Sequence, residues 1–414
     1  MDKLTIYGLS DSAEMFDLRE FLRRGIVDYD LIKLDDTSKT IPTAFQHPTA
    51  DKNFFGIQFP DGTLLTNPSL AEVGKKLGWI NKPKYDEYDL SIYGAGPAGL
   101  SAAVYAASEG LRTILIERES IGGQAGSSSN IENYMGFPEG ICGADLAEKA
   151  RQQALKFGVE ILLLQEGVKG TFKNNRIHVN MADGSELIAK SNICATGIEY
   201  AKLGLPNEEQ FMHKGMYYGA GATEACFCHG KEIFVVGGGN SAGQAATFFS
   251  KFAQKVYMVV RKGNLSETLS DYLVKRVTTI PNIEILYNSE IKELDGDEIL
   301  CRIKILNNED GSETWYDTSK VFICIGGKPN TDWAIDTPIM RDMNGYLITG
   351  SDLPCRPGFA NIWKENRDPY FLETSVPGSF AAGDVRYNSV KRVAAAVGEG
   401  AIAVTMVHKY LAGL

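Results

Sequence analysis

A glycine-rich turn is the first place in the chain where residue types and spacing could support a chemistry. Gly94, Gly96 and Gly99 form the pattern GxGxxG between the apolar segment 89–93 and an alanine-rich segment. Glycines at this spacing allow a tight turn and let backbone N–H groups approach a pyrophosphate at the N-terminus of a helix. Glu117 follows 23 residues after Gly94, where a carboxylate at a strand end can bind ribose hydroxyls. We therefore expect a site for FAD or a similar dinucleotide.

A second turn of related sequence differs from the first in one informative place. Gly237, Gly239 and Ala242 form the pattern GxGxxA, and Arg261, followed by Lys262, stands 24 residues after Gly237. Basic groups at the ribose position accommodate a 2′-phosphate, whereas a carboxylate favours a free 2′-hydroxyl. The sequence thus predicts NADP(H) in preference to NAD(H) at this second site. The alternative is that both basic residues form a solvated strand end.

Each glycine turn needs a strand, a helix and a second strand to position it. The segments 89–119 and 231–262 both follow that order, so we expect two nucleotide-binding βαβ units about 140 residues apart. Ahead of them, hydrophobic patterns predict these elements: a strand at 3–9, a helix at 11–25, a strand at 28–34, a hairpin at 54–65 turning at Asp61-Gly62, and a helix at 70–79. The polar segment 81–89 is expected to be a linker.

Composition narrows the function classes. The net charge is −10, which argues against nucleic-acid binding. No apolar run reaches the roughly 18 residues that a membrane span needs, and the first twelve residues lack the pattern of a signal peptide. The seven scattered cysteines are typical of reduced cytoplasmic thiols, and no metal-ligand spacing is present. We therefore expect a cytoplasmic protein with no metal site and no membrane partner.

Residues 86–410 resemble the low-molecular-weight thioredoxin reductase family of FAD/NAD(P) flavoproteins. Besides the two glycine turns, four short segments carry the resemblance: Gly122-Gly123-Gln124, Ile131-Glu132-Asn133, Ala195-Thr196-Gly197 and Gly383-Asp384.

The resemblance implies an α/β fold with two Rossmann-like domains. An FAD domain is split between residues 85–198 and 328–414, and an NADP domain, 199–327, is inserted between its halves. Hinges near Gly197 and Gly326-Gly327 would let the inserted domain rotate. The resemblance also implies a homodimer.

The same resemblance implies which residues bind each cofactor. For FAD they are Gly94, Gly96, Pro97, Ala98, Gly99, Glu117, Gly123, Gln124, Asn133, Ala195, Thr196, Gly197, Gly383, Asp384, Lys391, Arg392 and Val393. For NADP they are Gly237, Gly239, Asn240, Ser241, Ala242, Arg261 and Lys262. Among them, Gln124 and Asn133 are expected at the flavin half and Asp384 at the ribityl chain. Residues 391–393 are expected to begin a helix whose N-terminus faces the isoalloxazine ring.

The chain departs from this family at the redox dithiol. Counted back from the glycine turn, the CxxC window falls on residues 220–223, which read Ala-Gly-Ala-Thr. Glu224 keeps the carboxylate that follows the dithiol, and we expect it to handle a proton near the flavin. The alternative is that Glu224 is a helix N-terminal residue stabilised by the helix dipole.

Cys226 and Cys228 lie just beyond that window. If this segment is helical, residues two apart point about 200° away from each other, and a disulfide needs Cβ vectors that converge. We therefore interpret both thiols as structural. The alternative is that they form a redox pair.

The N-terminal segment 1–84 resembles a thioredoxin or glutaredoxin fold. Where active members carry a CxxC, this chain has Ser12-Ala13-Glu14-Met15, and the segment contains no cysteine. Thiol chemistry needs a thiolate, so we interpret this domain as a redox-inert docking or structural unit.

These observations favour an FAD-dependent NADPH oxidoreductase whose acceptor is not reduced through a CxxC. The acceptor is unidentified, and a small redox protein or a small molecule would fit. Two alternatives stay open. One is a disulfide reductase that uses Cys226 and Cys228 or thiols of a partner, and the other is a redox-sensing nucleotide-binding flavoprotein with low turnover.

Overall fold

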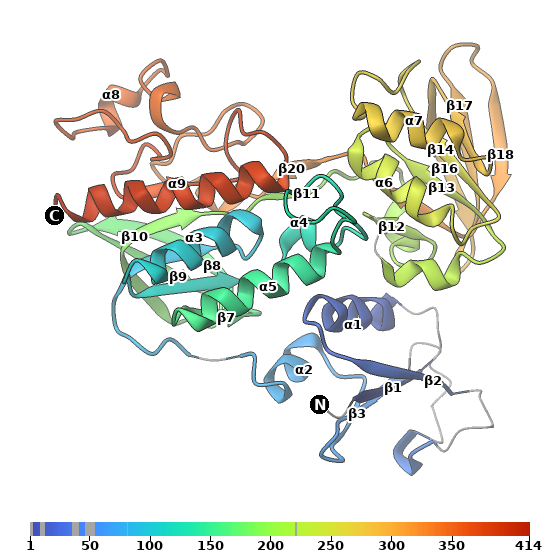
Figure 1. Cartoon of the computed structure of the whole chain (residues 1–414), viewed down its shortest axis with the longest axis horizontal. Helices are drawn as coiled ribbons and strands as arrows, with labels where there is room; N and C mark the ends of the chain where they lie inside the picture. Colours follow the sequence, from blue (N-terminus) through green and yellow to red (C-terminus); the bar gives the residue numbers. More distant parts are fainter. Residues whose placement is uncertain (1–2, 9–12, 35–40, 46–53, 81, 220–221) are drawn as a thin grey trace. The chain divides into compact units, whose positions relative to one another are not determined.

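The computed structural model describes residues 3–8, 13–34, 41–45, 54–80, 82–219 and 222–414 (Figure 1). The chain forms two compact units. Unit 1 comprises Met1–Ser69, Ser127–Ile131 and Tyr200–Gly327, and unit 2 comprises Leu70–Gly126, Glu132–Glu199 and Lys328–Leu414. Within the described residues, no helix is both long and apolar enough to cross a membrane.

Unit 2 is built on a seven-stranded sheet. Its strands are β5 (Tyr88–Tyr93), β6 (Thr113–Glu117), β7 (Glu160–Leu163), β8 (Gly167–Lys173), β9 (Arg176–Met181), β10 (Glu186–Cys194) and β21 (Ser379–Ala381). The order is β7-β6-β5-β10-β9-β8, with β21 also on β10. The pairs among β5, β6, β7, β10 and β21 are parallel, so their carboxyl ends share one edge of the sheet.

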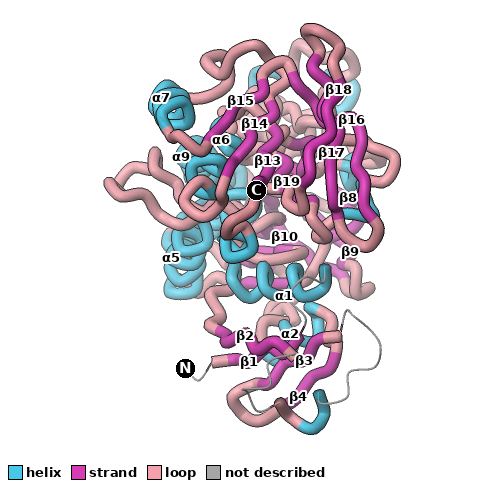
Figure 2. The backbone as a smooth tube through the Cα atoms, turned by 90° about the vertical axis from the view of Figure 1, so that its right-hand side faces the viewer, coloured by secondary structure: helices cyan, strands magenta, loops and turns pink. Residues whose placement is uncertain are grey.

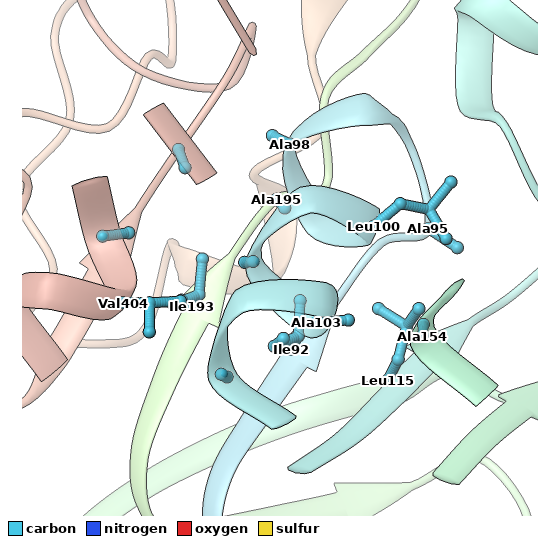
Figure 3. Close-up of a cluster of buried hydrophobic side chains, with 14 of the residues drawn as sticks. Ile92, Ala95, Ala98, Leu100, Ala103, Leu115, Ala154, Ile193, Ala195 and Val404 are labelled. Atoms are coloured by element: carbon cyan, nitrogen blue, oxygen red, sulfur yellow. The ribbon is translucent and has the colours of Figure 1, made fainter. Parts of the chain in front are cut away.

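Helices cover this sheet and complete the core of unit 2. They are α2 (Leu70–Lys76), α3 (Pro97–Ser108), α4 (Gly123–Gly126), α5 (Gly143–Lys156), α8 (Phe359–Ile362) and α9 (Val393–Leu411), with 3₁₀ turns η4 (Asp332–Ala334) and η5 (Gly350–Asp352). Figure 3 shows how Ile92, Leu115 and Ile193 of the sheet meet Ala103 of α3 and Val404 of α9. The absence of a side chain at Gly400 of α9 lets this helix approach α3 closely, since a Cβ there would lie 2.2 Å from the carbonyl oxygen of Ala98.

The larger part of unit 1 holds a five-stranded parallel sheet with the order β12-β19-β13-β14-β15, and Figure 2 shows β19, β13, β14 and β15 of it side by side. Its elements are β12 (Met216–Tyr218), β13 (Glu232–Val236), β14 (Lys255–Val259), β15 (Ile283–Leu286) and β19 (Val321–Ile323), with α6 (Asn240–Phe249), α7 (Asp271–Thr279), η2 (Glu208–Phe211) and η3 (Ala222–Phe227). An antiparallel sheet adds β16 (Ser289–Gly296), β17 (Leu300–Asn307) and β18 (Glu313–Asp317). The short strands β11 (Ile198–Tyr200) and β20 (Gly327–Pro329) stand where the chain enters and leaves this part.

The N-terminal part of unit 1 is a four-stranded sheet with the order β2-β1-β3-β4. It consists of β1 (Leu4–Gly8), α1 (Ala13–Arg24), β2 (Tyr29–Lys33), η1 (Thr43–Phe45), β3 (Phe55–Gln58) and β4 (Leu64–Thr66). The predicted strands, helix and hairpin are confirmed. Strands β1 and β2 are parallel, and the hairpin turn has Gly62 at φ 84°.

The predicted α/β class with two dinucleotide-type folds is confirmed. The boundary between compact units lies at Ser69–Leu70, ahead of the expected linker at 81–89. The helix α2 belongs to unit 2 because a Cβ on its Gly74 would meet Leu164 at 2.6 Å, and Trp79 just beyond packs on the core of that unit.

Candidate functional site

The first glycine turn is closed so tightly that side chains would not fit. Gly94 follows β5 with φ 103°, and a Cβ there would lie 2.3 Å from the carbonyl oxygen of Ala195. A Cβ on Gly99 would lie 1.8 Å from the carbonyl oxygen of Gly94. Gly96 precedes α3, which begins at Pro97. The first N–H groups of a helix have no partner within it, so this turn can offer donors to a pyrophosphate.

Glu117 lies at the end of β6 and holds the glycine turn in place. One carboxylate oxygen accepts the N–H of Ala95 at 2.8 Å, and the other accepts the N–H of Glu119 at 2.8 Å. The side chain is buried. These bonds put the carboxylate beside the turn, where the sequence predicts ribose binding. They also give Glu117 a structural task that spacing alone did not indicate.

A second turn of unit 2 abuts the first. Gly122 and Gly123 have φ of 101° and 51°, and a Cβ on Gly123 would meet the Cα of Gly96 at 3.1 Å. Gln124 follows in α4 and is half-buried, whereas Asn133 is exposed. The structure therefore brings Gly123 and Gln124 to the edge where β5 and β6 end.

The carboxyl ends of β10 and β21 add the other predicted FAD residues. Ala195 follows β10 and donates its N–H to Tyr93 at 2.8 Å. The hydroxyl of Thr196 donates to the carbonyl of Asn330 at 2.7 Å, and Gly197 has φ 64°. Gly383 follows β21 with φ 81°, and its Cβ would lie 2.9 Å from the Cβ of Ala98 on α3.

A buried ion pair supports the turn at Gly383. Glu399 accepts the N–H of Gly383 at 2.7 Å and pairs with Arg386 at 2.6 Å. Both side chains of the pair are nearly buried. Sequence reasoning missed this pair, although a lone carboxylate inside the apolar helix 393–411 was a signal for a buried partner.

Charged groups gather where α9 begins. Arg392 precedes the helix, and Lys391 donates to the carbonyl oxygen of Asp384 at 2.6 Å. Burial raises the pKa of Asp384, and Glu399 raises it further, whereas Lys391 and Arg392 lower it. Burial also lowers the pKa of Lys391. The first turn of α9, which starts at Val393, carries the positive end of the helix dipole, so this corner suits a group that gains negative charge.

Most of the predicted FAD residues thus lie at or just beyond the ends of parallel strands: 94–99, 117, 123, 124, 195–197, 383 and 384. Residues 391–393 lie at the start of α9. The glycine turns form cradles that a Cβ would fill, and this arrangement fits a dinucleotide. Asn133 lies outside these turns, on an exposed segment.

The second glycine turn repeats this geometry in unit 1. Gly237 follows β13 with φ 137°, and a Cβ there would lie 2.3 Å from the carbonyl oxygen of Cys324. Gly239 precedes α6, and Ala242 is buried against the turn. Asn240 accepts the N–H of Ser270 at 2.8 Å, while Ser241 is exposed at the start of α6. The turn therefore has the form of a nucleotide site.

Arg261 and Lys262 follow β14 and are exposed. Lys262 is paired, with its Nζ 2.5 Å from Oε2 of Glu267. The carboxylate of Glu267 was not predicted, because the sequence prediction considered the two basic residues and did not include the loop that follows them.

Glu224 lies in η3, which is a 3₁₀ helix, and is only 3% exposed. One oxygen, Oε2, accepts no hydrogen bond from any residue that the structure describes. Burial, reinforced by the negative charge of Glu20, raises the pKa of Glu224 to about 8, against the opposing effect of Arg23 and Arg19. This carboxyl group is therefore largely protonated at neutral pH.

The helix α1 of the N-terminal part packs against η3 and β12. The guanidinium of Arg19 lies 4.8 Å from the ring centroid of Phe227. Phe16 lies 4.5 Å from the ring of His213 and 5.2 Å from that of Tyr217. Asp17 pairs with His213 at 2.9 Å. This packing of an N-terminal helix against the segment beside residues 220–223 had no signal in the sequence motifs.

Of the two thiols in this segment, Cys228 is fully buried, and its Sγ donates to the carbonyl of Glu224 at 3.3 Å. The side chain of Cys226 lies outside the described part of the chain, as do Ala220 and Gly221 of the predicted window and Ser12 of the N-terminal one. Among the residues that are described, no cluster of His, Cys, Asp and Glu could hold a metal ion.

Comparison with known proteins identifies the family to which this chain is similar. Residues 88–400 match the family model of pyridine nucleotide-disulphide oxidoreductases. The thioredoxin reductase of Peptoclostridium acidaminophilum is 34% identical over 330 residues, which are 78% of this chain and 97% of the relative. The thioredoxin reductase of Bacillus subtilis is 33% identical over 330 residues, covering 78% and 95%. The crystal structure of Lactococcus lactis thioredoxin reductase has a TM-score of 0.69 at 29% identity, covering 79% of this chain and 100% of that one.

Proposed function

The chain belongs to the pyridine nucleotide-disulphide oxidoreductase family and is an FAD-dependent NAD(P)H oxidoreductase, and we propose that this enzyme passes electrons to its acceptor without using a CxxC dithiol in its own chain. The observation that carries this proposal is the sequence Ala-Gly-Ala-Thr at 220–223. The burial of Cys228 supports it, because a buried thiol is a poor partner for thiol–disulfide exchange.

Bound FAD would supply the redox chemistry, namely hydride acceptance from a nicotinamide nucleotide and electron release to an acceptor. The protein binds and orients. The glycine turn at 94–99 and the first turn of α3 hold the pyrophosphate. Asp384 would hold the ribityl chain, and the positive end of α9 would favour negative charge on the ring. The pair of Glu399 and Arg386 keeps the turn at Gly383 in the required conformation.

The nicotinamide nucleotide binds at the turn 237–242, with Arg261 and Lys262 at the ribose phosphate, so NADPH is preferred over NADH. Glu224 acts as a proton donor and acceptor. Its pKa of about 8 means that it can donate and recover a proton near neutral pH.

The N-terminal part acts as a docking unit without redox chemistry of its own. Its α1 packs on η3 through Arg19, which lies over Phe227, and on β12 through Phe16, which lies beside Tyr217. The acceptor is a small redox protein or a small molecule, and the enzyme works as a cytoplasmic homodimer.

Anaerobic stopped-flow reduction tests this proposal. We expect NADPH to reduce the bound FAD faster than NADH does, and a panel of quinones and small electron-carrier proteins to reoxidise it. Thiols titrated before and after reduction by NADPH should not differ in number. Two new thiols per FAD would refute the proposal, as would equal or better use of NADH.

A second candidate is a reductase of thioredoxin that uses Cys226 and Cys228. The names of the relatives favour it. NADPH-dependent reduction of thioredoxin that is lost in the Cys228→Ala variant would establish it. Unchanged flavin reduction without thioredoxin turnover would leave the first proposal standing.

A further inference from the structure

We propose that Glu267 is a specificity-determining residue that weakens the preference of the second nucleotide site for a 2′-phosphate. This inference rests on the proposed function, because it takes the turn at 237–242 with Lys262 as the nucleotide site. Lys262 is one of the two basic residues, with Arg261, that the sequence predicts for the 2′-phosphate, and the structure shows it bound to a carboxylate, with Nζ 2.5 Å from Oε2 of Glu267.

Glu267 is held beside the site by the loop that carries it. The flanking Leu265 and Leu269 are 2% and 5% exposed. Thr268, the next residue, donates its hydroxyl to the carbonyl of Gly238 in the glycine turn at 2.6 Å. A second donor, Asn264 Nδ2, lies 3.2 Å from Oε1 of Glu267. The loop therefore keeps Glu267 near the glycine turn, and its carboxylate contacts both Lys262 and Asn264.

The pair is weak enough for a ligand to compete with it. The side chains of Lys262 and Glu267 are 55% and 53% exposed, and such surface pairs contribute little to stability. The hydrogen bond from Lys262 lowers the pKa of Glu267, so the carboxylate is charged at neutral pH.

The two nucleotides meet this carboxylate differently. A 2′-phosphate must take Lys262 away from Glu267 and then remain close to its negative charge, which repels it. A free 2′-hydroxyl can donate a hydrogen bond to a carboxylate, which is the usual arrangement in NAD sites. Glu267 therefore narrows the difference between NADPH and NADH that Arg261 and Lys262 create.

The test is a calorimetric titration of the FAD-loaded protein with 2′,5′-ADP and with 5′-AMP. These probes report the ribose site without any electron transfer. In the Glu267→Gln variant, we expect the Kd for 2′,5′-ADP to fall about fivefold at low ionic strength, because one charge repulsion in water is removed. The Kd for 5′-AMP should stay within about twofold, and the preference for NADPH in flavin reduction should rise in parallel.

The matched control is Glu293→Gln, which removes the carboxylate of another 2.5 Å lysine pair, that of Lys304 in the antiparallel sheet of the same unit. We expect it to leave both Kd values unchanged. An unchanged or raised Kd for 2′,5′-ADP in Glu267→Gln overturns the inference, and so does an equal fall in the control. If the unaltered protein binds neither probe, the proposed nucleotide site itself is refuted.

Discussion

Replacing Glu224 with Gln removes a buried carboxyl group whose ionisation opposes the packing of α1 on η3. The native side chain is 3% exposed and lies near Glu20, Arg23 and Arg19 of α1. Glutamine has nearly the same shape as the protonated acid. The substitution therefore tests the charge of Glu224 with little change in packing.

The magnitude follows from the pKa. Raising the pKa of Glu224 from 4.5 to about 8 corresponds to about 5 kcal/mol at 1.36 kcal/mol per pH unit. The folded protein binds more protons here than the unfolded chain does between these two values. The free energy of any opening that exposes Glu224 therefore falls as the pH rises from about 4.5 to about 8 and levels off above that range.

Hydrogen–deuterium exchange of the α1 amides measures this opening free energy locally. At pH 5 the variant and the native protein should agree within about 1 kcal/mol, because pH 5 lies only about half a unit above the pKa of 4.5 that the carboxyl group has in the opened chain, so most of the loss has not yet developed. At pH 8 the variant should be more protected by about 2–5 kcal/mol, because it has no carboxylate to ionise.

The control is Glu14→Gln, which removes an exposed carboxylate from the same helix. It should show the pH dependence of the native protein. Protection of α1 that varies with pH equally in native protein and Glu224→Gln would refute the reasoning, because the charge of Glu224 would then not govern the packing.

Three further substitutions probe the two units. Gly99→Ala should lower the FAD content of the purified protein more than tenfold, as measured by absorbance, because its Cβ would lie 1.8 Å from a backbone oxygen. The control Gly170→Ala should keep its FAD, because no atom lies nearer than 4.0 Å to the added Cβ. Glu399→Ala should cost about 3–5 kcal/mol in denaturant unfolding, since it leaves a buried arginine unpaired, and Glu109→Ala in an exposed pair should cost under about 1 kcal/mol. Phe16→Ala should accelerate proteolysis of α1, because about 1–3 kcal/mol of packing free energy is lost. An unchanged cleavage rate would contradict the packing of α1 against the rest of unit 1.

The parts of the site that sequence predicted are those set by local spacing. A glycine turn between a strand and a helix has one backbone geometry, so Gly94 and Gly237 could be placed with their φ requirements from the pattern alone. The helix that begins at Val393 was expected from the family resemblance, and the structure has it there. Glu117 was placed correctly at its strand end, but its bonds to the turn depend on how two strands align.

The contacts that sequence did not predict join residues that are distant in the chain or depend on side-chain packing. Glu399 is paired with Arg386 and Gly383 because a helix returns over a turn. Phe16 meets His213 across about 200 residues. The pair of Lys262 and Glu267 is local, but a loop with no regular period can direct a side chain to many places. Hydrophobic spacing does not predict any of these contacts.

The close contact of α3 and α9 has a consequence for synthesis of the chain. Ser101 donates its hydroxyl to the carbonyl of Val397, 296 residues later, at 2.7 Å, and Gly400 lies against Ala98. A ribosome delivers α3 long before α9, and domains fold as their segments emerge. The sheet of residues 216–323 can fold while unit 2 still lacks one side of its core. Nascent unit 2 therefore exposes the small apolar residues of α3 until the last helix arrives, and that interval is when a chaperone has most to protect.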